Sequence, residues 1–292
     1  MKKFVHPDCI GCLFDQLKKV LTSFKPEISY EEIITHQKEL MKRLVNLPLS
    51  DFGSPNLGKV VYGLASEILG VPDPYKKEKV YIQNKAKDLY PKLKNLVEKS
   101  KNPLLQACII SIMGNALDLG APRPIDIEND IKNISDDDLK INDFTHFEEN
   151  LEGAQKILII GDNTGEIFFD KVLIEEILRQ NPKKEITYSV RSGPIINDSL
   201  KEDAIFAGIE KICNVIENTD YPGIILEETT PEFQELFYSC DLIIMKGQGN
   251  FESAENVETN GIVYFFLKAK CHVIEEYFDI PLGGLILMKK RK

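Results

Sequence analysis

The stretch KILIIGDNTGEIFFD, which runs from Lys156 to Asp170, decides the fold. Its apolar run Ile157–Ile160 has no polar alternation, a pattern typical of a strand that is buried on both faces of a sheet. The next segment, from Phe168 to Leu178, has apolar residues at helical spacing. We therefore predict a strand, a tight turn and a helix, which is where open α/β sheets carry ligand-binding residues.

The predicted turn carries Asp162, Asn163 and Glu166, so carboxylate and carboxamide oxygens gather at a helix N-terminus. Oxygen ligands suit a hard divalent cation, and a helix N-terminus favours an anion such as phosphate. The spacing fits neither the dinucleotide fingerprint GxGxxG nor the P-loop. An alternative is that Asp162 or Asn163 only caps the helix, and for Glu166 a ligand role and a helix-dipole role are equally consistent with the sequence.

Two further turns after predicted strands are rich in functional groups. The turn after Glu185–Val190 begins with Arg191 and ends with Asn197 and Asp198, and the turn after Leu242–Met245 reads Lys246-Gly247-Gln248-Gly249-Asn250. A lysine followed by glycines can cradle a phosphate, because glycine lets backbone N–H groups approach a ligand. Each turn alone could be a helix cap. Three such turns at one sheet edge favour a shared site.

The composition limits the class of partner. The chain has 292 residues and a net charge of −10, which argues against the large basic surface needed for nucleic acid or an anionic membrane. No apolar stretch reaches the roughly 20 residues of a membrane span, and residues 1–9 have no secretory apolar core. We expect a cytoplasmic protein with a small-molecule partner; the sequence leaves its oligomeric state open.

The pattern of apolar and polar residues changes near the middle of the chain. Helical spacing runs from Cys9 to Leu119, where prolines such as Pro91 are expected to separate the helices, and an acidic, loop-like segment covers Gly120–Asp143. We predict an α/β protein in which a helical N-terminal domain, residues 1–145, packs on a three-layer α/β/α Rossmann-like domain, residues 146–292, with a mostly parallel sheet. The strands expected in the second domain are Ile157–Ile160, Glu185–Val190, Lys211–Ile216, Leu242–Met245 and Gly284–Met288.

Three segments of the second half resemble a known family. GDNTGEIFFD, VRSGPIINDSLKEDA and KGQGNFE are similar to signature segments of the damage-control phosphatases, also called domain of unknown function 89. The similarity extends to GNALDLG at Gly114 and FLKAK at Phe266, and so covers nearly the whole chain. The resemblance implies a metal-dependent phosphatase that acts on small phosphometabolites such as sugar phosphates.

The resemblance also implies roles for individual residues. The metal ligands would be Asp162, Asn163 and Asp198, and the expected ion is Mg²⁺ or Mn²⁺ from the ligand chemistry, or Co²⁺ or Ni²⁺ from the family. From the chemistry of the residues themselves, we expect direct attack by water, oriented by Glu166 or Asp198. The candidate substrate-binding residues are Asn115 and Asp118 from the helical domain, with Arg191, Lys246, Gly247, Asn250 and Lys268.

Two other functions compete with phosphate ester hydrolysis. In one, the same residues hold a metal and a phosphorylated ligand without catalysis, as a sensing module. In the other, the protein transfers a methyl group to protein carboxylates, as has been proposed for some relatives. We place methyl transfer last because no glycine-rich strand-turn-helix motif suited to a methyl donor is present.

The cysteines form a separate question. His6 and the pair Cys9 and Cys12 lie at the start of the first predicted helix, and Cys271 and His272 could join them as zinc ligands. A disulfide, inert thiols and redox chemistry are the alternatives, and the second CxxC that would strengthen the zinc interpretation is absent. The remaining cysteines, which lie in apolar runs, are expected in the core: Cys108, Cys213 and Cys240.

Overall fold

A computed structural model describes residues 5–49, 53–114 and 138–291. Within them, seven strands form one sheet in the order β1-β7-β6-β5-β2-β3-β4. The strands are β1 (Leu139–Asn142), β2 (Lys156–Ile160), β3 (Glu185–Val190), β4 (Asn214–Glu217), β5 (Leu242–Lys246), β6 (Ile262–Lys268) and β7 (Leu285–Lys289).

The helices before the sheet are α1 (Pro7–Phe24), α2 (Tyr30–Val45), α3 (Ser54–Leu69), α4 (Lys76–Lys99) and α5 (Pro103–Gly114). Those that alternate with the strands are α7 (Phe144–Gly153), α8 (Ile167–Gln180), α9 (Lys201–Ala207), α10 (Pro231–Ser239), α11 (Gly247–Ala254) and α12 (His272–Phe278). Local signals set several ends. Ser29 and Glu32 form a capping box at α2, and Gly70 ends α3 in the left-handed conformation.

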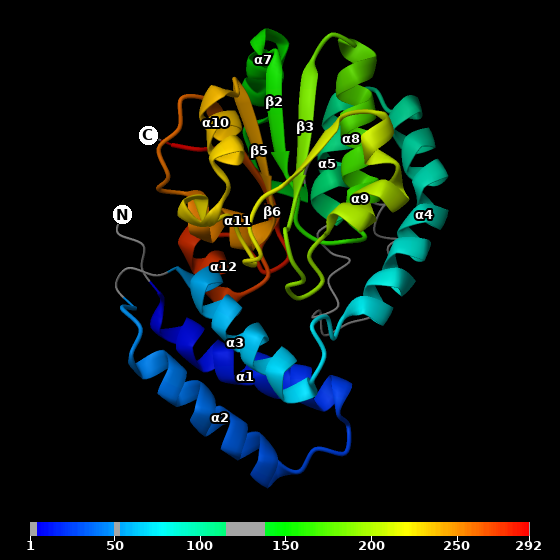
Figure 1. The fold of residues 1–292 in the computed structure, drawn as a ribbon. Helices are drawn as coiled ribbons and strands as arrows, with labels where there is room; N and C mark the ends of the chain where they lie inside the picture. Colours follow the sequence, from blue (N-terminus) through cyan, green and yellow to red (C-terminus); the bar gives the residue numbers. More distant parts are fainter. Residues whose placement is uncertain (1–4, 50–52, 115–137, 292) are drawn as a thin grey trace.

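The central strands have buried side chains on both faces. Ile157 and Ile159 of β2 pack with α4, α5, α7, α8 and α9, whereas Leu158 and Ile160 pack with α10, α11 and α12. Successive strand residues point to opposite faces, so one continuous apolar run supplies both cores. Figure 1 shows helices on both sides of the sheet. The predicted α/β class with a three-layer, mostly parallel sheet is confirmed.

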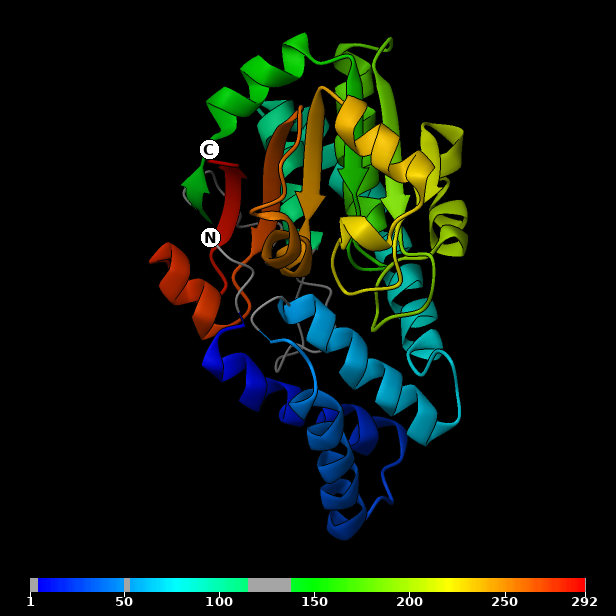
Figure 2. The same ribbon diagram turned by 60° about the vertical axis from the view of Figure 1, so that its left-hand side comes forward.

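Helices α1, α2 and α3 have a hydrophobic core of their own, which includes Leu17, Leu21, Leu40 and Leu57. In Figures 1 and 2 they lie beyond the carboxyl ends of β2, β3 and β5, toward which the arrowheads point. We call these three helices the cap. The cap therefore covers the sheet edge where the sequence predicts functional side chains.

Helices α4 and α5 pack against the sheet rather than in the cap. Leu93 of α4 and Ile109 of α5 belong to the same hydrophobic core as Phe169 of α8. The change from one core to the other thus falls between α3 and α4 in the described residues. The predicted domain division at residue 145 stays a prediction.

The structure differs from the predicted elements in four places. Strands β1 and β6 were not predicted, and β4 begins at Asn214 because Ile209–Lys211 forms a short 3₁₀ helix. Helix α4 continues through Pro91, which faces solvent while Leu89 and Leu93 on either side are buried. Burial of this apolar stripe outweighs the hydrogen bond that an interior proline removes.

The cap core should be sensitive to a cavity. Leu17→Ala removes a side chain with 0% exposure and should lower the free energy of unfolding by about 2–5 kcal/mol in urea denaturation. Leu282→Ala is the matched control: Leu282 is 59% exposed, and the change should stay within about 0.5 kcal/mol. Equal effects of the two substitutions would contradict the burial of Leu17 in the cap core.

Candidate functional site

The candidate site lies at the carboxyl end of β2, where the path of the chain from strand to strand reverses direction across the sheet. From β2 the chain continues to β3 on one side, while β5 pairs with the other side of β2. Gly247, directly after β5, has φ +79°, and a Cβ added there would lie 2.0 Å from Oδ2 of Asp162. Any other residue would therefore displace the Asp162 carboxylate, which explains the glycine at this position.

Backbone hydrogen bonds join the turns that follow β2 and β3. The Thr164 N–H donates to the Asn197 carbonyl at 2.9 Å, and the Ser199 N–H donates to the Asp162 carbonyl at 2.8 Å. Asn163 and Asp198 form an isolated antiparallel bridge between these bonds. The predicted metal ligands thus lie on two chain segments that are held side by side.

Arg191 links the two acidic side chains. Its Nε donates to Oδ2 of Asp198 at 2.7 Å, and its Nη2 lies 3.8 Å from Oδ1 of Asp162. The same guanidinium donates to Asn218 and Asn250 at 3.4 and 3.2 Å, and the residue is 1% exposed. A rigid, planar guanidinium suits this role because it can bind several oxygens in fixed directions.

Negative charge is concentrated around Asp162. Burial raises the pKa of Asp162 to about 8, and the charges of Asp198 and Glu166 act in the same direction, against Lys270 and Arg191. The ionised form of Asp162 is therefore costly in the protein alone. A bound cation would relieve this cost.

Behind the turn lies a second, fully buried cluster around Lys246. The Lys246 ammonium is 2.8 Å from Oε1 of Glu166 and 3.0 Å from Oδ1 of Asp170, and it donates to the carbonyl and the hydroxyl of Ser111 at 2.7 and 2.8 Å. Ser111 and Tyr188 in turn donate to the two oxygens of Asp170, at 2.6 and 2.8 Å. Lys246 joins β5, α5 and α8 in one network.

The charges of this cluster stabilise one another. Although burial alone would lower it, the pKa of Lys246 is raised, because Asp170 and Glu166 favour the ammonium form. Burial raises the pKa of Asp170 despite the opposing charge of Lys246. Lys246 therefore remains a cation within the protein.

Most of the predicted site residues lie together. The Asn163 amide donates to Asp162 at 3.0 Å and to Glu166 at 3.2 Å. The turn after β2 is therefore in contact with the Lys246 cluster. Lys268 ends β6 and is half-buried, near Gly283. The predicted residues Asn115 and Asp118 lie outside the described residues.

Three residues with predicted substrate-binding roles, Arg191, Lys246 and Asn250, lie in surroundings that the sequence did not predict. Lys246 and Arg191 are buried and bonded to protein groups, and the Asn250 amide donates to the carbonyls of Gly161 and Lys246 at 3.2 and 2.6 Å. All three hold parts of the site in place. Whether they also contact a substrate stays a prediction.

Sequence reasoning missed Asp170, Ser111, Tyr188 and Asn218. Asp170 lies four residues after Glu166, a spacing that puts both acids on one helix face, and it stands among apolar residues. Asn218 directly follows β4, where the rule used for the other strands would have found it. Ser111 and Tyr188 carry no comparable signal.

The cysteines do not form a metal cluster in the structure. The described residues contain no group of three or more His, Cys, Asp or Glu side chains arranged to hold an ion, and all six cysteines are free thiols. Burial raises the pKa of Cys9, with a contribution from Glu252, so the lowered pKa that would support redox chemistry at a helix N-terminus is not found. Asp8 and His272 form an ion pair, with Oδ2 and Nε2 2.7 Å apart. This contact joins the starts of α1 and α12.

Among the residues that the structure describes, no helix combines the length and the apolar character needed to cross a membrane.

Comparisons with known proteins agree with the fold and the motifs. The family model described as damage-control phosphatase ARMT1-like domain matches residues 5–286. A protein from Pyrococcus horikoshii named damage-control phosphatase is 31% identical over 98% of both chains. Another of that name, from Archaeoglobus fulgidus, is 32% identical over 97% of this chain and 98% of its own. A crystal structure of a DUF89 family protein from Pyrococcus horikoshii superimposes over 100% of both chains with a TM-score of 0.87 at 29% identity.

Removing the buried cation should destabilise the protein. Lys246→Met leaves Glu166 and Asp170 buried without their counter-charge, so we expect a loss of about 3–5 kcal/mol in urea denaturation. Lys18→Met is the control, because Lys18 forms only an exposed pair with Asp15 and should show no measurable change. An unchanged stability of Lys246→Met would contradict the stabilising role that we assign to this buried ion-pair network.

Proposed function

The chain belongs to the ARMT1-like damage-control phosphatase family, and from this premise we propose that it hydrolyses phosphate monoesters of small metabolites at the turns after β2, β3 and β5. The observation that carries the proposal is the convergence of two buried carboxylates, Asp162 and Asp198, with the carboxamide of Asn163 at the reversal point of the sheet. This is where α/β folds bind ligands.

The donor set fits a hard divalent cation. Asp162, Asn163 and Asp198 offer only oxygen ligands, and burial together with the neighbouring Asp198 and Glu166 raises the pKa of Asp162, so a bound cation would favour its ionised form. We propose Mg²⁺ or Mn²⁺ as the ion, with Co²⁺ or Ni²⁺ as alternatives. When bound, it would supply Lewis-acid stabilisation of the charge that develops on the phosphoryl group.

The protein groups around the ligands would fix their geometry. Arg191 holds Asp198 through Nε, and Lys246 holds Oε1 of Glu166 while Asn163 donates to its other oxygen. We propose that Glu166 or Asp198 orients the attacking water. Prior placement of these groups lowers the barrier because no reorganisation is needed during the reaction.

The proposed reaction is a simple hydrolysis. The water oxygen forms a bond to phosphorus, the bond between phosphorus and the ester oxygen breaks, and the leaving alcohol gains the proton that the water loses. Lys268, at the carboxyl end of β6, is the proposed cationic contact for the phosphate, and Asn115 and Asp118 are proposed contacts from the segment before β1.

Phosphate release tests the proposal. Protein treated with a chelator is incubated with glycerol, ribose and fructose phosphates and with p-nitrophenyl phosphate, before and after addition of Mg²⁺, Mn²⁺, Co²⁺ or Ni²⁺. Release that requires a metal would support a metal-dependent phosphatase. Binding of the esters without release would favour a sensing module, and methyl transfer from S-adenosylmethionine to protein carboxylates would favour the third function.

Asp162→Asn should lower metal-stimulated phosphate release by at least about 100-fold, because changing even an outer partner of a metal ligand costs about 10- to 100-fold. The fold should persist, since the amide keeps the size of the side chain. Asp88→Asn, on the exposed face of α4, is the matched control and should leave release unchanged. Full activity of Asp162→Asn, measured at saturating metal, would rule out the proposed ligand set.

A further inference from the structure

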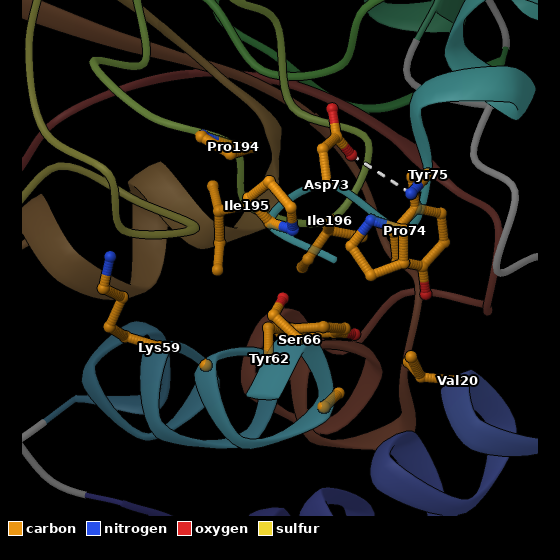
Figure 3. Close-up of a pocket in the computed structure, with 13 residues that line it drawn as sticks. Val20, Lys59, Tyr62, Ser66, Asp73, Pro74, Tyr75, Pro194, Ile195 and Ile196 are labelled. Atoms are coloured by element: carbon orange, nitrogen blue, oxygen red, sulfur yellow. Dashed lines mark hydrogen bonds between the residues drawn. The ribbon is translucent and has the colours of Figure 1, made fainter. Parts of the chain in front are cut away.

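The cap has an inner and an outer side. On the inner side, Tyr62 and Ser66 of α3 face Ile195 of the turn after β3 across a pocket (Figure 3). On the outer side lies α2, the helix of the cap that is farthest from the sheet in Figures 1 and 2. The outer surface of α2 is therefore remote from the candidate site, and another molecule can cover it without closing that site.

Helix α2 carries two rows of apolar side chains. One row is buried in the core of the cap and consists of Ile33, Leu40 and Leu44. The other row, which we call the outer stripe, is exposed and consists of Tyr30 (86% exposed), Ile34 (51%), Met41 (55%) and Val45 (79%). At about 100° per residue, the outer stripe occupies about 60° of the helix circumference and lies about a quarter of a turn from the buried row.

The outer stripe has the character of an interface. Four of the twelve large apolar side chains that are exposed in the described residues lie on this one helix. Apolar residues that are exposed singly are common, but a row of them on one helix face is typical of an interaction surface. Glu31, Glu32 and Glu39 of the same helix would repel an anionic membrane. The outer stripe therefore favours a protein partner.

The spacing of the outer stripe fits a second copy of the same chain. Its members are four, seven and four residues apart, so the pattern is the same when it is followed from either end of the helix. A two-fold axis through the middle of the stripe would place two such helices antiparallel. Tyr30 would then lie opposite the partner's Val45, and Ile34 would lie opposite the partner's Met41.

The charges beside the outer stripe are complementary in an antiparallel pair. Glu31 and Lys42 are both exposed and lie on the same side of the stripe, because they are about three helical turns apart. Each Glu31 would face the partner's Lys42, so the acidic first turn of one helix meets the basic last turn of the other. A parallel pair would bring like charges together. Lys38, beside the middle of the stripe, can extend so that its charge stays in water.

We propose that the protein forms a symmetric dimer through the outer stripes of two antiparallel α2 helices. One helix from each copy gives an interface at the small end of the range for specific association, about 1,200 Å² in total, so a dissociation constant of about 1–100 µM is expected. The two candidate sites lie on the opposite side of the cap. Dimerisation should therefore leave phosphate release per subunit unchanged.

Sedimentation velocity of the full-length protein measures the association. The average mass should rise from 33.2 kDa toward twice that value as the concentration increases from about 1 to 300 µM. Ile34→Glu should weaken association by at least about tenfold, because symmetry buries the new carboxylate against apolar side chains twice in each dimer. Met41→Lys should have the same effect. Ile205→Glu is the matched control, because Ile205 lies on α9 and is 54% exposed, and it should leave association unchanged.

An equimolar mixture of the two variants tests the direction of pairing. In the antiparallel dimer of one variant with the other, the carboxylate introduced by Ile34→Glu faces the ammonium introduced by Met41→Lys. The remaining Met41 and Ile34 side chains face each other as in the unaltered protein. The mixture should therefore associate within about tenfold of the unaltered protein, although each variant alone stays monomeric. A parallel pair would gain nothing from mixing.

The circular dichroism spectrum and the urea midpoint of each variant should match those of the unaltered protein, since both substituted side chains are exposed. A monomer at every concentration, or a dimer that Ile34→Glu leaves intact, would overturn the proposal and leave the outer stripe to a different partner. Loss of association in both variants without recovery in the mixture would overturn the antiparallel pairing. Failure of the proposed phosphatase would appear in the release assay alone.

Discussion

The buried Lys246 ammonium is the interaction on which the arrangement of the site depends. It stands at the end of β5, yet its partners come from α5 and from the start of α8, so three elements far apart in sequence converge on one charge. An ammonium removed from water is tolerated only when oxygens surround it, and the two carboxylates and Ser111 provide them. These carboxylates in turn need the cation, so the groups fix one another.

This reciprocal dependence determines how Glu166 can act. One of its oxygens belongs to the buried cluster, and the other accepts from Asn163, next to Asp162. Glu166 therefore connects a structural ion pair with the proposed metal ligands. Arg191 connects Asp198 in a comparable way to Asn218 and Asn250. Two cations, Lys246 and Arg191, thus pair with the carboxylates of the proposed metal site. This pairing explains how closely spaced carboxylates persist beneath the cap.

The sequence was sufficient to predict the class of fold and the convergence of three turns, because buried parallel strands are continuous apolar runs and their carboxyl ends share one edge. It did not reveal β6, since a short apolar run is compatible with either a buried strand or a buried helix. It also placed Lys246 at the correct strand end without showing that its side chain turns inward. Whether a strand-end lysine meets solvent or an ion pair depends on Ser111 and Asp170, whose contacts with it arise only from tertiary packing.

The position of β7 has a consequence for how the sheet is completed during synthesis. β7 lies between β1 and β6, antiparallel to β6 and parallel to β1, and Leu139 pairs with Leu285. While the chain emerges from the ribosome, β1 has no partner strand among the described residues until β7 is made, and one edge of β6 remains open. Loop closure over such a separation is slow, and open strand edges can pair with other chains. The nascent protein is thus exposed to misassembly until residues 285–289 arrive to join the two strands.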